Sequence, residues 1–294
     1  MTRLSGTALH QWRRQLLAEL PGPSSGLDWL LDLEAGLSWQ LLQASQLHPE
    51  RELQLRCGLD HLAALWRRHC SDQVPLQYLL GRCPWRDLEL AVSDAVLIPR
   101  QETELLVELA GDLVRATGST PRRWADLGTG SGCLALALAR LWPSSEGWAV
   151  DRSAEALAIA RANAEHWGLP GARLHWCSGD WWAPLAPQAG SLDLVVSNPP
   201  YIPSAVVDAL EPVVRDHEPR LALDGGVDGL DALRCIIGEA PRMLAPGGWL
   251  LLEHHHDQAE AVVELMQRAE LVDCRSAADL EGHARFALAR RERP

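Results

Sequence analysis

The chain has 294 residues, of which 47% are hydrophobic, and 39 acidic against 27 basic side chains give it a formal net charge of −12. This length and apolar content allow one large globular domain or two modest ones, and the acidic balance argues against a protein that works mainly by gripping nucleic-acid phosphates. Seven cysteines without a C-x-x-C pair indicate reduced thiols, and neither a signal segment nor an apolar run near the ~18 residues of a membrane helix is present, so we expect a soluble, cytoplasmic protein.

Residues 1–84 are expected to form a small helical bundle. Leucines recur at helical spacing in two stretches, the second of which begins near His48 and runs to Cys70. The apolar set of the first stretch is Leu27, Leu30, Leu31, Leu37 and Leu41, and that of the second is Leu53, Leu55, Leu59, Leu62 and Leu65. This region contains no catalytic constellation, so we interpret it as a domain for docking a substrate.

Residues 85–99 predict a hairpin that links two domains. Leu88, Leu90 and Val92 alternate with polar or small residues, which is typical of a half-buried strand. A second apolar run, Ala95–Ile98, follows a short polar turn and is expected to form the other strand.

Residues 100–294 alternate between helix and strand patterns. Helices are expected over 102–117, 132–141, 153–167 and 228–244, and strands near Arg123–Leu127, Trp148–Asp151, Arg173–Cys177, Leu192–Ser197 and Trp249–Glu253. Two further strands are expected near 270–275 and 284–290. This rhythm predicts an α/β domain with a doubly wound, Rossmann-like parallel sheet.

A glycine-rich turn joins the first of these strands to its helix. It comprises Gly128, Thr129, Gly130, Ser131 and Gly132, a spacing one residue shorter than the dinucleotide-binding pattern. Glycines allow a tight turn and let backbone N–H groups approach a ligand. Asp151 ends the next strand, where an acid can accept hydrogen bonds from both hydroxyls of a ribose. An ordinary strand–helix turn followed by a surface Asp is the alternative, but the agreement of strand, turn, helix and acid favours a cofactor site.

Asp180 and Trp181 follow the third strand. A carboxylate beside an indole can hydrogen-bond an adenine amino group and stack on its ring. Trp181 and Trp182 can equally serve as core packing, and the sequence alone leaves these two interpretations open.

Asn198, Pro199, Pro200 and Tyr201 follow an apolar strand directly, at the edge where parallel sheets bind ligands. A planar –NH₂ group has two donors, and the Asn198 side-chain oxygen and the Pro199 carbonyl can accept one each. These acceptors would stabilise the positive charge that develops on the nitrogen as a methyl group arrives. The Tyr201 ring can pack against the flat target. A rigid loop exit is the alternative, and we favour the catalytic interpretation.

The chain resembles the HemK/PrmC family, the protein-(glutamine-N5) methyltransferases that act on class 1 peptide chain release factors. The resemblance extends over most of the chain and rests on the glycine turn, Asp151, Asn198–Tyr201 and several further motifs. These motifs are Pro75–Gly81, Leu97–Glu104, Glu218–Pro219 with Ala222–Gly226, Asp228–Leu230, Pro246–Gly248 with Glu253, and Gly282 with Arg285.

The resemblance implies a class I S-adenosylmethionine-dependent methyltransferase with a seven-stranded sheet and a helical N-terminal domain. It implies that the glycine turn and Asp151 bind S-adenosylmethionine, that Trp181 lies along the adenosine, and that Asn198–Tyr201 hold the glutamine amide of a Gly-Gly-Gln loop. Asp180 and Asn198 are also expected beside the cofactor. The expected partner is a class 1 release factor, without direct contact to nucleic acid or membrane, and the chain is expected to be a monomer.

Two positions depart from the family pattern: Gln101 stands where Pro is common, and His255 where Gly is usual. The run His254–His256 would alternate sides at a strand end, so we expect a solvated loop and no metal. Three alternatives stay open: a glutamine methylase of a ribosomal protein, an adenine-N6 methyltransferase of nucleic acid, which the acidic charge disfavours, and a non-catalytic cofactor-binding protein.

Overall fold

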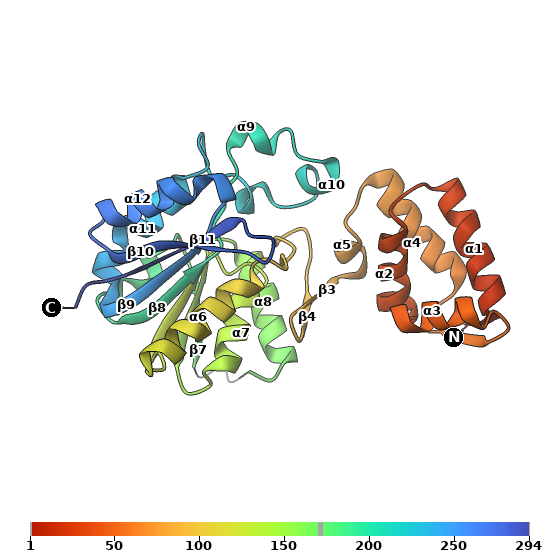
Figure 1. Ribbon diagram of the computed structural model, residues 1–294, viewed down its shortest axis with the longest axis horizontal. Coiled ribbons are helices and arrows are strands. Elements are labelled where there is room, and N and C mark those ends of the chain that lie inside the picture. Colours follow the sequence, from red (N-terminus) through yellow and green to blue (C-terminus); the bar gives the residue numbers. More distant parts are fainter. Residues whose placement is uncertain (1, 170–172, 294) are drawn as a thin grey trace. The chain divides into compact units, whose positions relative to one another are not determined.

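The computed structural model describes residues 2–169 and 173–293. The chain divides into two compact units (Figure 1). The first unit comprises Met1–Gly81 with Pro212–His217, and the second comprises Arg82–Glu211 with Glu218–Pro294. Among the described residues, no helix is both long enough and apolar enough to cross a membrane.

The first unit is mainly helical. Its elements are β1 (Thr2–Ser5), α1 (Gly6–Glu19), α2 (Ser24–Ala35), α3 (Trp39–Leu47), β2 (Glu52–Leu55), α4 (Leu59–Asp72), α5 (Leu76–Leu80) and α10 (Pro212–Arg215). Side-chain caps fix two helix starts, because Ser5 Oγ accepts from Ala8 N and Ser38 Oγ accepts from Leu41 N. The helix ends at Gly36 and Gly81 have positive φ, which glycine adopts without strain.

The expected helix from His48 to Cys70 is wrong in its first part. Residues 52–55 form strand β2, which pairs antiparallel with β1, and helix α4 begins only at Leu59. Leu53 and Leu55 are both buried while their neighbours are exposed, so their spacing of two is the pattern of a strand.

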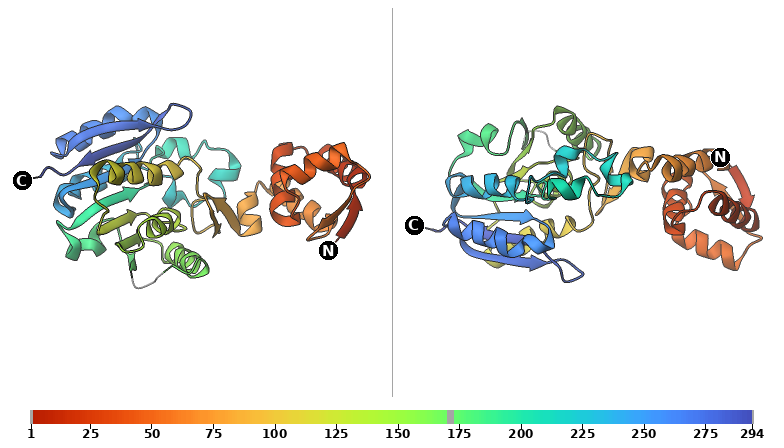
Figure 2. Two further views of the ribbon diagram at one scale, coloured as in Figure 1. Left: turned by 60° about the horizontal axis from the view of Figure 1, so that its bottom comes forward. Right: turned by 90° about the horizontal axis from the view of Figure 1, so that it is seen from above.

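The second unit is built on a seven-stranded sheet in the order β10-β11-β9-β8-β5-β6-β7. Its strands are β5 (Arg123–Leu127), β6 (Glu146–Asp151), β7 (Leu174–Ser178), β8 (Leu192–Ser197), β9 (Leu244–Glu253), β10 (Val272–Ala278) and β11 (Ala284–Arg290). Strands β5 to β9 run parallel, and β11 is antiparallel to both of its neighbours. Figure 2 presents the sheet from two further directions, with the blue C-terminal strands at one edge. The predicted α/β class is confirmed.

Helices cover both faces of this sheet (Figure 1). One face packs against α6 (Glu104–Thr117), α7 (Cys133–Leu141) and α8 (Ala154–His166), and the other packs against α11 (Asp231–Met243), α12 (Ala259–Arg268) and the short helix η1 (Ala183–Gln188). The shorter elements α9 (Ser204–Val207), η2 (Arg220–Ala222) and η3 (His256–Gln258) lie in loops at the ends of strands β8 and β9. Because both faces are covered, the central strands read as continuous apolar runs.

The hairpin expected over 85–99 lies earlier in the chain. It consists of β3 (Arg82–Trp85) and β4 (Leu88–Ala91), and residues 95–98 are not a strand. Leu88 and Leu90 are buried on one side of β4, which explains the alternation in the sequence, whereas Val96 and Leu97 line a cavity described below.

One cross-strand pair in the sheet combines the largest and the smallest side chain. Trp124 of β5 lies opposite Gly147 of β6, and its indole occupies the space that a side chain at position 147 would need. A Cβ atom added to Gly147 would lie 2.2 Å from Trp124 Cζ2. Trp124 belongs to the apolar core that packs under α6 and α7.

Candidate active site

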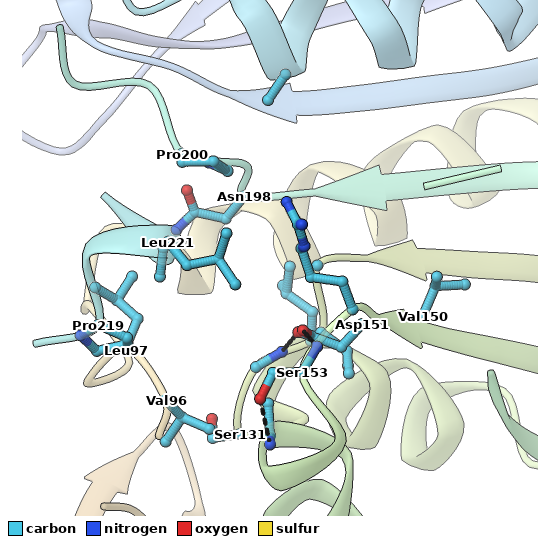
Figure 3. A pocket seen from close by; sticks show the side chains of 18 of the residues that line it. Val96, Leu97, Ser131, Val150, Asp151, Ser153, Asn198, Pro200, Pro219 and Leu221 are labelled. Atoms are coloured by element: carbon cyan, nitrogen blue, oxygen red, sulfur yellow. Dashed lines mark hydrogen bonds between the residues drawn. The ribbon is translucent and has the colours of Figure 1, made fainter. Parts of the chain in front are cut away.

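The carboxyl ends of the parallel strands open onto a cavity of about 300 Å³ in the second unit. Parallel sheets bind ligands at this edge, because loops after neighbouring strands meet there. Figure 3 shows the cavity from close by, with Val96, Leu97, Pro219 and Leu221 on one side, Val150, Asp151 and Ser153 on the other, and Asn198 and Pro200 at one end.

The glycine turn forms part of the cavity wall between β5 and α7. Gly128 has φ +74° and a Cβ atom there would meet the Trp181 ring at 3.4 Å, so a side chain would be strained and crowded. Gly132 has φ +85°, and a Cβ atom there would meet Leu136 Cδ1 at 2.8 Å. The first glycine thus admits a ring beside the turn, and the last one permits close packing of helix α7.

Asp151 is the last residue of β6 and lines the cavity. Its Oδ2 accepts from Gly130 N and its Oδ1 accepts from Ser153 N, each at 2.9 Å. Burial raises the pKa of Asp151, while these backbone hydrogen bonds lower it. Each carboxylate oxygen has a second acceptor site, so the side chain can still receive two hydroxyl groups from a ligand.

The two adjacent tryptophans after β7 have different surroundings. Trp182 is 4% exposed, belongs to the apolar core and donates from Nε1 to the Ile236 carbonyl. Trp181 lines the cavity with a backbone φ of +43°, an unfavourable conformation for a bulky residue. Asp180 also lines the cavity, and its exposed carboxylate lies 3.3 Å from Arg152. The position of Trp181 therefore favours it over Trp182 as a stacking surface.

Asn198 follows β8 and is joined to two residues distant in sequence. Its Nδ2 donates to Thr103 Oγ1 at 2.9 Å, and Thr103 Oγ1 donates to Glu253 Oε2 at 2.7 Å. Thr103 precedes helix α6, and Glu253 is the last residue of β9. Asn198 and Thr103 both line the cavity.

Pro199 and Tyr201 do not line the cavity, whereas Pro200 does. Pro199 is buried, and Tyr201 points its hydroxyl at Glu253, with Oη 3.4 Å from Oε1. Burial is the main cause that raises the pKa of Tyr201, and burial also raises the pKa of Glu253 to about 7. The expectation that the Tyr201 ring covers the target group stays a prediction.

A buried carboxylate ties two walls of the cavity together. Glu218 accepts from Ile98 N at 3.3 Å through Oε2 and from Arg100 Nη2 at 2.6 Å through Oε1. Its side chain is 2% exposed. The segment 97–100 and the segment that follows Glu218 are thereby held beside each other.

The interpretation of His254–His256 as a solvated loop is wrong for the first residue. His254 is 0% exposed and donates from Nδ1 to the carbonyl of His255, and burial lowers its pKa. His255 has φ −66°, so a residue with a side chain fits where glycine is usual in the family. Within 2–169 and 173–293, no group of three or more acidic, His or Cys side chains is arranged to hold a metal ion.

The structure thus brings most of the expected site residues to one cavity. They are Gly128, Thr129, Gly130, Ser131, Asp151, Asp180, Trp181, Asn198 and Pro200, and Gly132, Pro199 and Tyr201 lie outside its lining. The sequence pattern did not predict chemical roles for Thr103, Glu253 and Glu218. All three belong to motifs that carry the family resemblance, which was the available signal.

Asp126 is a fully buried acid beneath the glycine turn. Its Oδ2 accepts from Thr129 Oγ1 at 2.6 Å and from Ala135 N at 3.1 Å. Burial raises its pKa to about 7, although these hydrogen bonds lower it. A group that titrates this far above its ordinary range makes stability depend on pH.

We therefore expect the free energy of unfolding to fall as the pH rises from about 4 to about 7. Folded Asp126 keeps its proton up to about pH 7, whereas the unfolded side chain loses it near 3.8, so the folded state binds more protons in this window. The stabilisation lost over this window is on the order of 4 kcal/mol. Asp126→Asn should reduce the pH dependence measured by urea denaturation, and the slope that remains is that of Glu253, whose pKa burial also raises to about 7. Asp112→Asn, at an exposed position of α6, should keep the wild-type slope, and an Asp126→Asn slope equal to wild type would contradict the assignment.

Comparison with known proteins agrees with this geometry. Residues 102–228 match the family model described as methyltransferase small domain. The release factor glutamine methyltransferase of Prochlorococcus marinus is 49% identical over 280 residues, covering 95% of each chain. That of Gloeobacter violaceus is 46% identical over 286 residues, covering 94% of this chain and 95% of the other. Among solved structures, the catalytic domain of hMettl16 in complex with the MAT2A 3'UTR hairpin 6 has a TM-score of 0.56 at 17% identity, over 82% of this chain and 84% of that one, which is a likeness of fold alone.

The resemblance inferred from the motifs is confirmed, because the relatives match nearly the whole chain and not only its glycine turn. Identity of this extent over both chains makes independent origins untenable. The chain therefore belongs to the release factor glutamine methyltransferase family.

Proposed function

We propose that this chain transfers a methyl group from S-adenosylmethionine to the side-chain amide nitrogen of the glutamine in the Gly-Gly-Gln loop of class 1 peptide chain release factors. The observation that carries the proposal is the hydrogen bond from Asn198 Nδ2 to Thr103, which leaves Asn198 Oδ1 as the free acceptor at the cavity. The relatives named release factor glutamine methyltransferase cover the chain almost completely, which supports the same activity here.

The residues of the cavity fit S-adenosylmethionine. Asp151 offers an acceptor on each carboxylate oxygen for the ribose hydroxyls, and Trp181 offers an indole for the adenine. The glycine turn allows close approach of the ligand to the backbone. When bound, S-adenosylmethionine supplies a methyl group on a positively charged sulfur.

Asn198 and Pro199 are proposed to hold the acceptor. An amide nitrogen is a weak nucleophile, because its lone pair is delocalised into the carbonyl group. Acceptors on its two N–H groups define the plane of the amide and stabilise the positive charge that develops on nitrogen. Asn198 Oδ1 and the Pro199 carbonyl provide two such acceptors. The two glycines of the substrate's Gly-Gly-Gln loop have no side chains, so the loop can enter the cavity without a clash.

We propose that the first unit docks the protein substrate. Its helix α3 presents two large apolar side chains to solvent, Trp39 at 66% and Leu47 at 78% exposure. A partner that covers these side chains would remove apolar surface from water, which favours association. The net charge of −12 suits a basic, RNA-associated partner. A substrate that works on the ribosome places the reaction in the cytoplasm, and we propose that the chain acts as a monomer.

The alternatives share the acceptor chemistry but fit the molecule less well. An adenine methyltransferase needs contacts to phosphates, and the excess of acidic side chains opposes such binding. A glutamine methylase of a ribosomal protein would use the same acceptors, so only the substrate distinguishes it.

Methylation of purified substrates with labelled cofactor tests the proposal. We expect an intact class 1 release factor to be methylated, with mass spectrometry placing one methyl group on the glutamine of its Gly-Gly-Gln loop. A short peptide of the loop should react more slowly than the intact factor, because the docking surface is then unused. Label found on DNA, or on a ribosomal protein in preference to the release factor, would refute the assignment.

A further inference from the structure

The Thr103 hydroxyl makes hydrogen bonds that are unusual for a residue in its position. It directly precedes helix α6, where a threonine normally accepts a hydrogen bond from a backbone N–H of the first turn. Here no such cap is made. The hydroxyl lies instead between Asn198 Nδ2 at 2.9 Å and Glu253 Oε2 at 2.7 Å. A local stabilising contact is thus replaced by contacts to residues 95 and 150 positions away.

The number of hydrogens fixes the direction of this chain of bonds. Above about pH 7, where Glu253 is ionised, its carboxylate can only accept, and the threonine hydroxyl has a single hydrogen to donate. Thr103 therefore donates to Glu253 and can only accept from Asn198. The Asn198 atom that faces Thr103 must then be the amide nitrogen, and Oδ1 must lie on the other side of the amide group.

Burial strengthens the hydrogen bonds of Thr103. Thr103 is 1% exposed and Glu253 is 2% exposed, so water does not compete for the hydroxyl. A hydrogen bond to a buried carboxylate is stronger than one between neutral groups. Packing alone does not require a hydroxyl group at position 103, because valine has nearly the same shape as threonine and would fill the same space.

We propose that Thr103 and Glu253 are positioning residues that select which end of the Asn198 amide faces the glutamine. The proposal rests on the proposed function, in which Asn198 Oδ1 accepts from the target –NH₂ group. If the Asn198 amide turned by half a rotation, its own –NH₂ group would face that of the target, and two donors would oppose each other. The pair therefore excludes an orientation that is useless for transfer, although neither residue needs to touch the reacting nitrogen.

Thr103→Val removes the hydroxyl and keeps the shape, so it is the principal test. We expect kcat on the release factor to fall about tenfold or more, up to the loss seen when Asn198 itself is removed. Affinity for S-adenosylmethionine, measured by calorimetry, should stay within about twofold of wild type, since the Thr103 hydroxyl bonds neither Asp151 nor Trp181, the proposed ribose and adenine contacts. Thr103→Ser should restore most of the activity lost in Thr103→Val. Thr117→Val makes the same chemical change at the other end of α6, where the hydroxyl bonds only backbone carbonyls, and should keep the wild-type kcat.

A double-mutant cycle separates positioning from a structural role. If Thr103 acts through Asn198, Thr103→Val should have no further effect on kcat in the Asn198→Ala background. Glu253→Gln removes the charge without opening a cavity, and it should lower kcat by less than Thr103→Val with cofactor affinity retained.

Three results would overturn the proposal: wild-type kcat in both Thr103→Val and Glu253→Gln, the same fold loss from Thr103→Val with and without Asn198, or a loss of cofactor affinity as large as the loss of kcat. If Asn198→Ala alone is as fast as wild type, the role of Asn198 in the proposed function fails as well. If Asn198→Ala is slow and Thr103→Val is not, only this inference fails.

Discussion

Asn198→Ala should lower kcat for the release factor by roughly 10²-fold or more while leaving the affinity for S-adenosylmethionine nearly unchanged. The reason is that Asn198 Oδ1 is proposed to stabilise charge that exists only in the transition state, and loss of one such contact typically costs this much. The hydrogen bond to Thr103 holds the amide in place before the substrate arrives, so little reorganisation is needed during transfer. Single-turnover kinetics and calorimetry measure the two quantities separately.

Asn198→Asp is the sharper companion variant. It keeps an acceptor toward the target, but it loses the N–H groups that donate to Thr103 and places a carboxylate near the buried Glu253. We expect reduced activity with cofactor binding intact. An Asn198→Ala enzyme as fast as wild type would remove Asn198 from the acceptor site.

Asp151→Ala should weaken S-adenosylmethionine binding by roughly 1.5–3 kcal/mol, which corresponds to about 10- to 150-fold in Kd. Asp151 ends β6 with both carboxylate oxygens beside the cavity, and each retains an acceptor site after binding Gly130 N or Ser153 N. Hydrogen bonds from ribose hydroxyls to this carboxylate would be charge-assisted and shielded from water. Isothermal calorimetry on the folded variant gives the difference directly.

Asp180→Ala provides the comparison. Its carboxylate also belongs to the cavity wall, but the side chain is 65% exposed and faces Arg152, so its contribution should be clearly smaller than that of Asp151. Because Asp151 also holds the glycine turn, the melting temperature of each variant should be measured alongside. Unchanged cofactor affinity in a folded Asp151→Ala variant would refute the ribose assignment.

The order of helices and strands in the second unit was predictable, because short stretches of sequence determine where each element forms. Apolar runs of five or six residues separated by amphipathic helices indicate parallel strands, and the strands at 123–127, 192–197 and 284–290 lie where the pattern predicts them. The edge of the sheet on which the loops meet follows from the topology. The pattern therefore also predicts that the glycine turn, Asp151 and Asn198 lie close together, and Gly128–Ser131, Asp151 and Asn198 all line the cavity.

The features that were not predictable depend on contacts between distant residues. The hydrogen bond between Thr103 and Glu253 joins positions 150 residues apart, and a contact over this separation cannot be predicted from hydrophobic periodicity. Strand β2 shows the same limit in part. The spacing of two between Leu53 and Leu55 is a strand pattern, but it covers only four residues before helix α4, and the pairing with Thr2–Ser5 establishes the strand. The two adjacent tryptophans were ambiguous for a similar reason, since the contact of Trp182 with Ile236 decides which of them belongs to the core.

The pairing of Trp124 with Gly147 constrains how this sheet can diverge between relatives. A side chain at position 147 would overlap the indole ring, so Gly147 cannot be exchanged for a larger residue while Trp124 remains. Loss of the indole alone would leave a void as large as a tryptophan under α6 and α7. Either change by itself is costly, whereas a joint exchange for two side chains of intermediate size conserves the total volume. The two positions should therefore covary in size across homologous chains, with the sum of their side-chain volumes held nearly constant.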